Sequence, residues 1–229
     1  MAAHLEKHFT SSQFIGDIII GLSDGLTVPF ALAAGLSGAV AHNNIIITAG
    51  IAELVAGSIS MGLGGYLAGK TEQEHYASEY KRENDEVDKV PDVEKEEVKQ
   101  VFAEYGISKK LQDEFADELS KNKERWVDFM MRFELGMQKP DERIATKSAL
   151  TIGLSYLVGG MVPLLPYFIT DKPLTGLKWS VVTTLLFLFL FGYVKTKFTG
   201  QSPFKGAVKT VFIGVIAAFA AYYIAKIVS

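Results

Sequence analysis

The sequence contains no cysteine in its 229 residues. This absence excludes disulfides, thiolate zinc sites, iron–sulfur ligation and thiol catalysis. Charge is also scarce over most of the chain, because residues 70–147 hold 21 of the 26 acidic and 15 of the 23 basic residues. The remaining sequence therefore has too few charged side chains to form the surface of a soluble globular protein.

Five apolar segments occupy the part of the chain that is poor in charge. Each is long enough to cross the hydrocarbon core of a bilayer, which takes a helix of about 20 residues. Backbone groups at an open strand edge cannot be satisfied in lipid, so all five are predicted to be helices. We expect an all-α, polytopic membrane protein; a soluble core of five buried helices is the alternative, but little polar sequence remains to cover it. The segments are residues 14–40, 43–69, 148–170, 174–194 and 206–225.

The charged segment, residues 70–147, lies between the second and third apolar segments and is predicted to be an inserted helical domain. The chain then divides into residues 1–69, 70–147 and 148–229. Helices are expected at about 70–88, 92–105 and 110–136, with Gly106 as a helix C-cap and a break near Lys121. The segment has six more acids than bases, so it would repel phosphate and does not favour nucleic-acid binding. Its predicted core face comprises Val98, Val101, Phe102, Leu111, Phe115, Leu119, Trp126 and Phe129.

The distribution of lysine and arginine predicts the orientation in the membrane. The link at residues 41–43 has no basic residue, whereas the charged segment and the link between the fourth and fifth helices are rich in lysine. Basic links remain in the cytosol. The N-terminus and residues 70–147 are therefore expected on the cytosolic side, and the C-terminus on the opposite side.

Three acidic residues, Asp17, Asp24 and Glu53, lie within the first two apolar segments. An aspartate at the centre of a membrane helix costs about 2.5–3.5 kcal/mol on insertion scales, so such groups usually line an ion path. Met61 lies two turns after Glu53 on the same helical face, which adds a thioether to the carboxylates. Carboxylates that only hydrogen-bond between helices are the alternative interpretation, and the role of Asp17, near its helix end, stays open.

Carboxylates also recur at helical spacing within the charged segment. Residues three or four positions apart share a helix face, so three such faces could form a cage of carboxylates with thioethers at its edge. Oxygen ligands suit divalent cations, and methionine sulfur favours the softer transition metals. A solvated acidic face is the other interpretation, and the pattern alone does not decide between them. The residues are Glu79, Glu83, Glu86, Glu94, Glu97 and Glu134, with Met130 and Met131.

Two long motifs carry a family resemblance. The run from Asp17 to Phe30, DIIIGLSDGLTVPF, and the run from Ala52 to Gly62, AELVAGSISMG, resemble the first two helices of the vacuolar iron transporter family. The similarity extends over nearly the whole chain and is strong with plant members. It implies a homodimer in the vacuolar membrane that exchanges cytosolic Fe2+ for protons. The chemistry of the Met61 thioether would favour Fe2+ over Mg2+ and Ca2+ and leave Mn2+, Co2+ and Zn2+ as competing ions.

The resemblance also implies roles for individual residues. Asp24 and Met61 would be ligands in the translocation path, with Glu53 near its cytosolic mouth. The cytosolic domain would bind metal, and the C-terminus would be lumenal. No enzymatic activity and no cofactor are implied. The domain's ligands would be Glu83, Glu86, Glu94, Glu97, Glu134, Met130 and Met131.

Five helices are few to enclose a path. We therefore predict that the first helices of two copies meet at a two-fold axis, with Asp24 of each facing a shared path. Two other functions have less support in the sequence. A di-iron enzyme would need Glu-x-x-His pairs on facing helices, but His75 is the only histidine in the charged segment. A membrane scaffold would not need three intramembrane acids.

Overall fold

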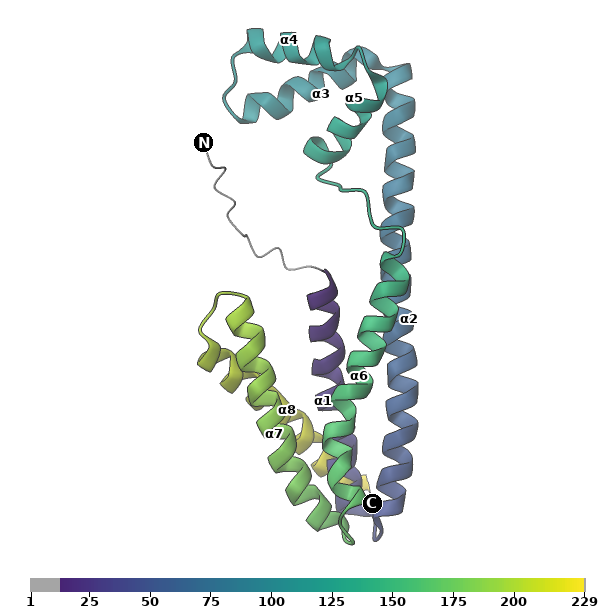
Figure 1. Cartoon of the computed structure of the whole chain (residues 1–229), viewed down its shortest axis with the longest axis vertical. Coiled ribbons are helices and arrows are strands. Elements are labelled where there is room, and N and C mark those ends of the chain that lie inside the picture. The colour runs from purple at the N-terminus through teal and green to yellow at the C-terminus, as the bar shows by residue number, and fades with distance from the viewer. Residues whose placement is uncertain (1–12, 229) are drawn as a thin grey trace, which may run out of the picture. The chain divides into compact units, whose positions relative to one another are not determined.

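The computed structural model describes residues 13–228, and these residues form helices without any strand (Figure 1). The prediction for the N-terminus concerns residues 1–12, which lie outside the described residues. In chain order the helices are α1 (Gln13–Ala39), α2 (Asn43–Lys89), α3 (Pro91–Glu104), α4 (Lys109–Leu119), α5 (Lys123–Phe129), the π-helix η1 (Met130–Glu134), α6 (Ile144–Phe168), α7 (Pro173–Phe198) and α8 (Pro203–Val228).

Five helices are long and apolar enough to cross a membrane, namely α1, α2, α6, α7 and residues Pro203–Ile224 of α8. The predicted all-α fold with five transmembrane helices is therefore confirmed. The second helix is the longest, with 47 residues, and it continues past its apolar part as the sequence predicted. At a rise of 1.5 Å per residue it is about 70 Å long.

The chain forms two compact units. The first, called here the membrane unit, contains the described residues up to Leu67 and those from Ala145 onward. The second, called here the acidic unit, contains Ala68–Ile144.

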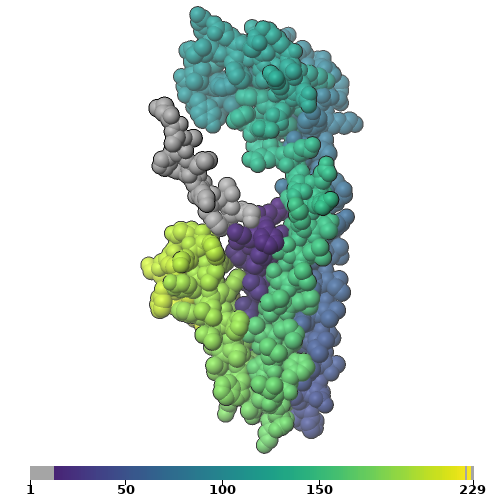
Figure 2. Space-filling model, in the orientation of Figure 1, coloured from purple at the N-terminus to yellow at the C-terminus, as the bar shows by residue number. Residues whose placement is uncertain are grey.

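In the membrane unit, α8 packs against α1 and α7, and α1 also contacts α7. Figure 2 shows part of α1 between the surface of α6 and that of α7 and α8. The crossing of α1 and α6 depends on glycine, because a Cβ atom at Gly25 would overlap the backbone of Tyr156. Small residues are the usual means by which membrane helices approach closely, since they remove side chains from the contact.

Polar side chains join α1, α2 and α6 at the end of the membrane unit near the α1–α2 link. The Asn43 amide donates to the Tyr167 carbonyl oxygen at 3.1 Å, and the Ser37 and Tyr167 hydroxyls are 2.9 Å apart. Tyr167 is 1% exposed. These hydrogen bonds satisfy polar groups that apolar surroundings would otherwise leave unpaired.

The acidic unit has its own hydrophobic core, formed by residues from α2, α3, α4, α5 and η1. Gly106 follows α3 with a φ of +73°, which confirms the predicted helix end, since glycine adopts this conformation without steric cost. The break predicted near Lys121 is also confirmed, because α4 ends at Leu119 and Asn122 caps α5. The buried core consists of Val87, Val98, Ala116, Trp126, Val127, Met130 and Met131.

The predicted core face of this unit is wrong at α4. Leu111 and Phe115 are 54% and 40% exposed, whereas Ala116 is buried. At the surface, ion pairs join α3 to α4, and Lys95 Nζ lies 2.8 Å from the Asp117 carboxylate. The apolar face of α4 that carries Leu111 and Phe115 thus lies at the rim of the core. There the Phe115 ring contacts the Phe102 ring edge-on, with ring centroids 4.4 Å apart.

Candidate functional site

Two polar side chains, from α2 and α6, meet inside the membrane unit, and an acid of α1 lies within electrostatic range of them. The buried Tyr156 of α6 donates its hydroxyl hydrogen to the Glu53 carboxylate of α2. The same tyrosine lies within electrostatic range of Asp24 on α1. The structure thus brings together two acids predicted from the sequence and adds a hydroxyl that the sequence analysis missed. The sequence feature that could have indicated it is a tyrosine in the middle of an uncharged apolar segment.

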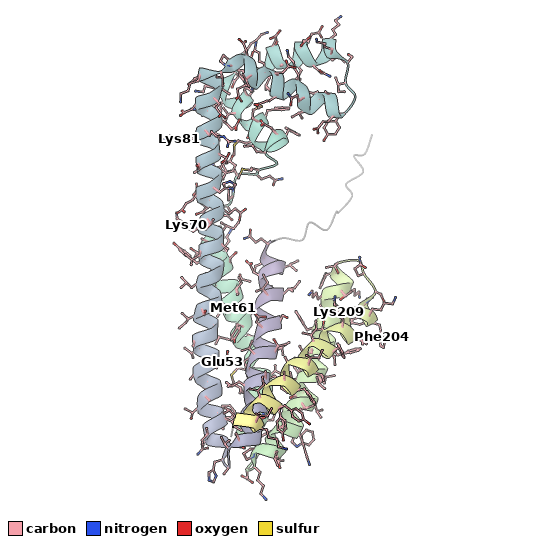
Figure 3. All side chains as sticks on the ribbon, turned by 180° about the vertical axis from the view of Figure 1, so that it is seen from behind. Glu53, Met61, Lys70, Lys81, Phe204 and Lys209 are labelled. Atoms are coloured by element: carbon pink, nitrogen blue, oxygen red, sulfur yellow. The ribbon has the colours of Figure 1, made fainter. Side chains whose placement is uncertain are left out.

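Gly57 makes this arrangement possible. It lies one turn after Glu53 on α2, and a Cβ atom built there would be 2.5 Å from the Tyr156 hydroxyl oxygen. The absence of a side chain at Gly57 therefore leaves the space through which the tyrosine reaches the carboxylate. Met61 follows one turn later on α2 and is partly exposed (Figure 3).

Asp17 belongs to a separate hydrogen-bond network. It is 8% exposed and accepts a hydrogen bond of 2.6 Å from the Ser148 hydroxyl on α6. The Gln13 amide donates in turn to Ser148 at 3.3 Å. Asp17 lies seven residues before Asp24, a rise of about 10 Å along the helix. The structure therefore places Asp17 in an α1–α6 contact rather than beside Glu53.

In the acidic unit, the predicted carboxylates from α2, α3 and η1 gather. Glu83 and Glu94 are 2% and 3% exposed, and in each the Oε2 atom is buried without a hydrogen-bond partner among the described residues. Glu94 lies within electrostatic range of all four other predicted acidic ligands, Glu83, Glu86, Glu97 and Glu134. Buried carboxylate oxygens normally have a partner, so these two are notable.

The carboxylates raise one another's affinity for protons. Burial, reinforced by the charges of Glu97, Glu83, Glu86 and Glu134, raises the pKa of Glu94 to about 7. Partial burial and the same group of acids raise the pKa of Glu134 to about 7, although the residue as a whole remains exposed. The pKa of Glu83 is also raised, chiefly by burial. A cation or a proton would relieve this accumulation of negative charge.

The π-helix η1 supplies three of the predicted ligands. Met130, Met131 and Glu134 lie in this single wide turn, and such turns are frequent at functional sites. Both methionines are 0% exposed and belong to the hydrophobic core, so each has a packing role. Among the described residues, no three histidine or acidic side chains already surround a point that could hold a metal ion. Metal ligation by this group stays a prediction.

Arg82 is a member of the cluster that the sequence analysis missed. Its guanidinium lies 2.8 Å from Glu79, 3.3 Å from Glu83 and 3.5 Å from Glu86. Its position between acids on the same helix was visible in the sequence, but the direction of its side chain was not.

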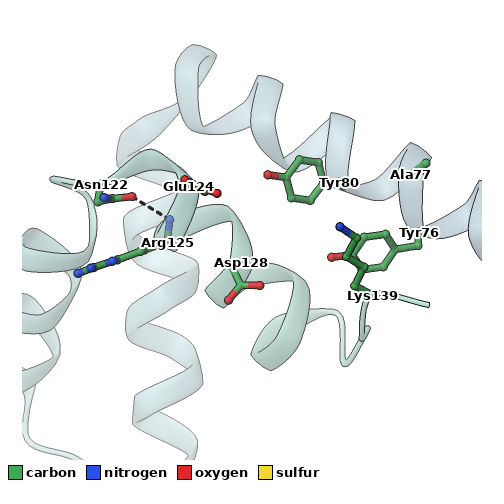
Figure 4. Close-up of a pocket in the computed structure, with 8 residues that line it drawn as sticks. All are labelled: Tyr76, Ala77, Tyr80, Asn122, Glu124, Arg125, Asp128 and Lys139. Atoms are coloured by element: carbon green, nitrogen blue, oxygen red, sulfur yellow. Dashed lines mark hydrogen bonds between the residues drawn. The ribbon is translucent and has the colours of Figure 1, made fainter. Parts of the chain in front are cut away.

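A separate hollow of about 900 Å3 lies between α2 and α5 in the acidic unit (Figure 4). None of its lining residues belongs to the predicted ligand set. It carries two acids and two bases, so its charges balance and it does not resemble a cation site. The lining residues are Tyr76, Ala77, Tyr80, Asn122, Glu124, Arg125, Asp128 and Lys139.

Residues 15–226 match the profile of the VIT family. The chain belongs to the VIT family. It is 55% identical over 225 residues to vacuolar iron transporter 1 of Arabidopsis thaliana, which covers 98% of this chain and 90% of the relative. It is 53% identical over 225 residues to vacuolar iron transporter 1 of Oryza sativa subsp. japonica, covering 98% of this chain and 89% of the relative.

A more distant VIT relative is protein CCC1 of Saccharomyces cerevisiae, at 43% identity over 225 residues, which covers 94% of this chain and 69% of the relative. The family resemblance predicted from the two motifs is therefore confirmed. Because the plant relatives are named as transporters, the prediction that this VIT protein is not an enzyme is confirmed as well.

Proposed function

We propose that this VIT-family protein is a multi-pass protein of the vacuolar membrane that moves Fe2+ from the cytosol into the vacuole in exchange for protons. The observation that carries the proposal is the group formed by Asp24, Glu53 and Tyr156 among apolar helices. Carboxylates are costly in a membrane and usually serve ion passage. The names of the plant relatives supply the metal and the membrane.

The chemistry of the path follows from its ligands. Metal binds to deprotonated carboxylates, so protons compete with it for the same oxygens. An acidic lumen would protonate Asp24 and release the metal, and the proton would return with the empty site. The Met61 thioether carries no proton and favours soft ions, which would disfavour Mg2+ and Ca2+ and leave Mn2+, Co2+ and Zn2+ as competitors. Tyr156 would orient the Glu53 carboxylate.

The acidic unit is proposed to bind divalent metal in the cytosol. The unpartnered Oε2 atoms of Glu83 and Glu94 support this role, since a cation would satisfy both. Glu86, Glu97 and Glu134 would complete an oxygen-rich site, with Met130 and Met131 beside it. Residues 1–12 and the acidic unit would be cytosolic and the C-terminus lumenal, as the lysine distribution indicates.

We also propose a homodimer with the path at its two-fold axis. Ile20 and Val28 lie one turn before and after Asp24 on α1 and are 47% and 44% exposed. Within the described part of the chain these two side chains remain half-exposed, so this stripe could meet its copy in a second protomer. A closed two-fold is the commonest form of self-association.

Transport by the purified protein in liposomes tests the function. Fe2+ uptake should require a proton gradient that is acidic on the lumenal side, and uptake of Mn2+, Co2+ and Zn2+ should follow in a metal panel, without uptake of Mg2+. Fe2+ uptake that does not change when a pH gradient is imposed would contradict the antiport mechanism and would indicate a channel.

Cysteines placed in this cysteine-free chain test the dimer. Ile20→Cys and Val28→Cys should each crosslink two protomers within the membrane, whereas Leu26→Cys, which is 2% exposed, should not. Gly25 is unsuitable because it faces α6 closely. Crosslinks absent from both exposed positions would leave one path per protomer.

A further inference from the structure

Arg82 is paired with more carboxylates than any other base whose ion pairs the structure describes. Its three acidic partners lie at positions −3, +1 and +4 on the same helix. Two of them, Glu83 and Glu86, are predicted metal ligands, and they receive no other ion pair among the described residues. The nearby bases are occupied elsewhere: Lys89 with Asp85, Lys95 with Asp117, Lys99 with Asp113 and Arg132 with Asp128.

The two sides of Glu83 differ. Its Oε1 atom faces the Arg82 guanidinium at 3.3 Å, while its Oε2 atom is buried and has no partner in the described part of the chain. Glu94 contributes a second buried oxygen without a partner. The guanidinium is 52% exposed at its side chain and thus covers the outer edge of the cluster. Both inner oxygens stay available, but the Glu83 carboxylate already pairs with a cation through its other oxygen.

The Arg82 guanidinium and a metal ion at the inner oxygens would compete for the same carboxylates. Arginine stays charged at every accessible pH, and its planar fork spans carboxylates that a compact ion would draw together. A divalent ion that draws Glu83 and Glu86 inward must therefore break the contacts of Arg82, whose half-exposed side chain can turn to solvent. This cost reduces the net gain from binding the metal.

We propose that Arg82 is a built-in counter-cation that competes with divalent metal for the carboxylates of the acidic unit. This inference rests on the proposed metal-binding role of that unit. Arg82 keeps the metal-free cluster folded by neutralising part of its charge, and it weakens the bound state so that the metal is released onward. A transport protein needs such weak holding, since a site that binds too tightly would retain its cargo.

Titration of the full-length protein in detergent with Co2+ by calorimetry tests this role. Arg82→Gln should tighten Co2+ binding by about tenfold, which corresponds to about 1.4 kcal/mol. Release of Co2+ to an excess of chelator should slow in proportion. Arg125→Gln is the matched control, because it removes the same charge from an exposed position in the same unit, where no ion pair joins Arg125 to the described residues. It should change the affinity by less than about twofold, as expected for a screened charge.

A second variant covers the case in which loss of the charge prevents folding. Arg82→Lys keeps the charge but cannot span three carboxylates, and it should tighten binding by about threefold, between the wild type and Arg82→Gln.

Unchanged or weaker Co2+ binding in a folded Arg82→Gln protein would overturn the inference. Equal tightening in Arg125→Gln would also overturn it, since the effect would then be general electrostatics. Failure of the proposed function has a different signature: the wild-type protein would bind no Co2+ that depends on Glu83, Glu86 and Glu134.

Discussion

Both units contain groups of carboxylates, but the side chains that stabilise those carboxylates differ between the two units. In the membrane unit, Glu53 accepts a hydrogen bond from the neutral Tyr156. In the acidic unit, Glu83 and Glu86 lie against the charged Arg82. A charged partner in an apolar medium would need its own desolvation, whereas a partner at a half-exposed edge keeps its water. The difference shows that a neutral hydrogen-bond donor can orient a carboxylate without competing with a metal ion for its negative charge.

The units also differ in how their helices approach one another. In the membrane unit, glycines such as Gly25 and Gly57 let a facing helix or side chain come close. The acidic unit instead uses a conventional hydrophobic core around Val98 and Trp126, with ion pairs between helices at its surface. Substitutions that add volume at these close contacts should therefore disturb the packing of the first unit, whereas the packing of the second should respond more to substitutions in its hydrophobic core.

The largest effect is expected at Asp24. Asp24→Asn keeps the size and polarity of the side chain but removes the charge and the titrating proton. Fe2+ uptake into liposomes should fall to the background of empty liposomes, while the protein still elutes as the same species from a sizing column. Proton-coupled uptake at the wild-type rate would contradict the assignment of Asp24 to the path.

The sequence predicted the fold well, and it predicted the site in part, for physical reasons. Long apolar runs define membrane helices because the bilayer fixes their length, so all five were found. Helical spacing placed Glu83, Glu94 and Glu134 on faces that do converge. The direction of a long side chain such as Arg82 depends on which carboxylate oxygens surround it, and those oxygens come together only when the helices pack.

Other features could not be predicted because they depend on tertiary contacts. Tyr156 reaches Glu53 through the gap at Gly57, and no local pattern pairs residues about a hundred positions apart. Periodicity assigned Leu111 to the core, but α4 packs through Ala116 and leaves Leu111 54% exposed. The π-turn at η1 also has no pattern of its own.

The second largest effect is expected in metal binding by the acidic unit. Replacement of Glu83, Glu86 and Glu134 together by Ala should remove most Co2+ binding from the full-length protein, measured by calorimetry. Removal of the same number of exposed acids, Glu114, Glu118 and Glu124, is the control for net charge and should leave most binding in place. Equal losses in both triple variants would mean that the cluster is an ordinary solvated acidic face.

Adding volume at Gly57 tests the contact between Tyr156 and Glu53. Gly57→Ala should displace the tyrosine hydroxyl, because the new Cβ atom would lie 2.5 Å from it. We expect Fe2+ uptake to fall by about tenfold, the effect of losing one positioned contact of about 1.4 kcal/mol. Gly64→Ala is the matched control on the same helix, because nothing lies within 4 Å of a Cβ atom there. It should transport normally and gain up to about 1 kcal/mol in helix stability.

A smaller effect concerns stability and pH in the acidic unit. The Glu94 carboxyl has a pKa of about 7 in the folded protein, above its ordinary 4.5. As the pH rises through this interval the unfolded chain releases the proton first, so the free energy of unfolding falls and then levels off above about pH 7. The metal-free protein should therefore melt at a lower temperature at pH 7.5 than at pH 5.

The buried Trp126 reports this melting, since it is 3% exposed in the core of the acidic unit. Its fluorescence should be followed in a Trp179→Phe background, which removes the other tryptophan. Glu94→Gln should flatten the dependence on pH, and Glu104→Gln, at an exposed position of the same helix, should not. The same dependence of the melting temperature on pH in the wild type and in Glu94→Gln would show that Glu94 is ionised in the fold.

The smallest effect is expected at Met61. Met61→Leu keeps an apolar side chain of similar volume, so a pure packing role should cost less than about 1.5 kcal/mol. If the Met61 thioether is a ligand, its loss should change the selectivity among metals more than the rate of uptake, because sulfur contributes more to the binding of Fe2+ and Co2+ than to that of Mn2+. The ratio of Co2+ to Mn2+ uptake is therefore the measurement, and it should fall by a few fold.

The methionines of the two units differ in their surroundings. Met130 and Met131 are fully enclosed in a hydrophobic core, whereas Met61 is partly exposed beside the polar residues of the path. Met130→Leu should therefore lower the melting temperature of the acidic unit. Met161→Leu is the control for the uptake ratio, because this side chain of α6 is 37% exposed and lies outside the predicted ligand set, and it should leave the Co2+ to Mn2+ ratio as it is. If Met61→Leu behaves in the same way, with an unchanged ratio, its sulfur takes no part in selecting the metal, and the carboxylates of Asp24 and Glu53 alone must do so.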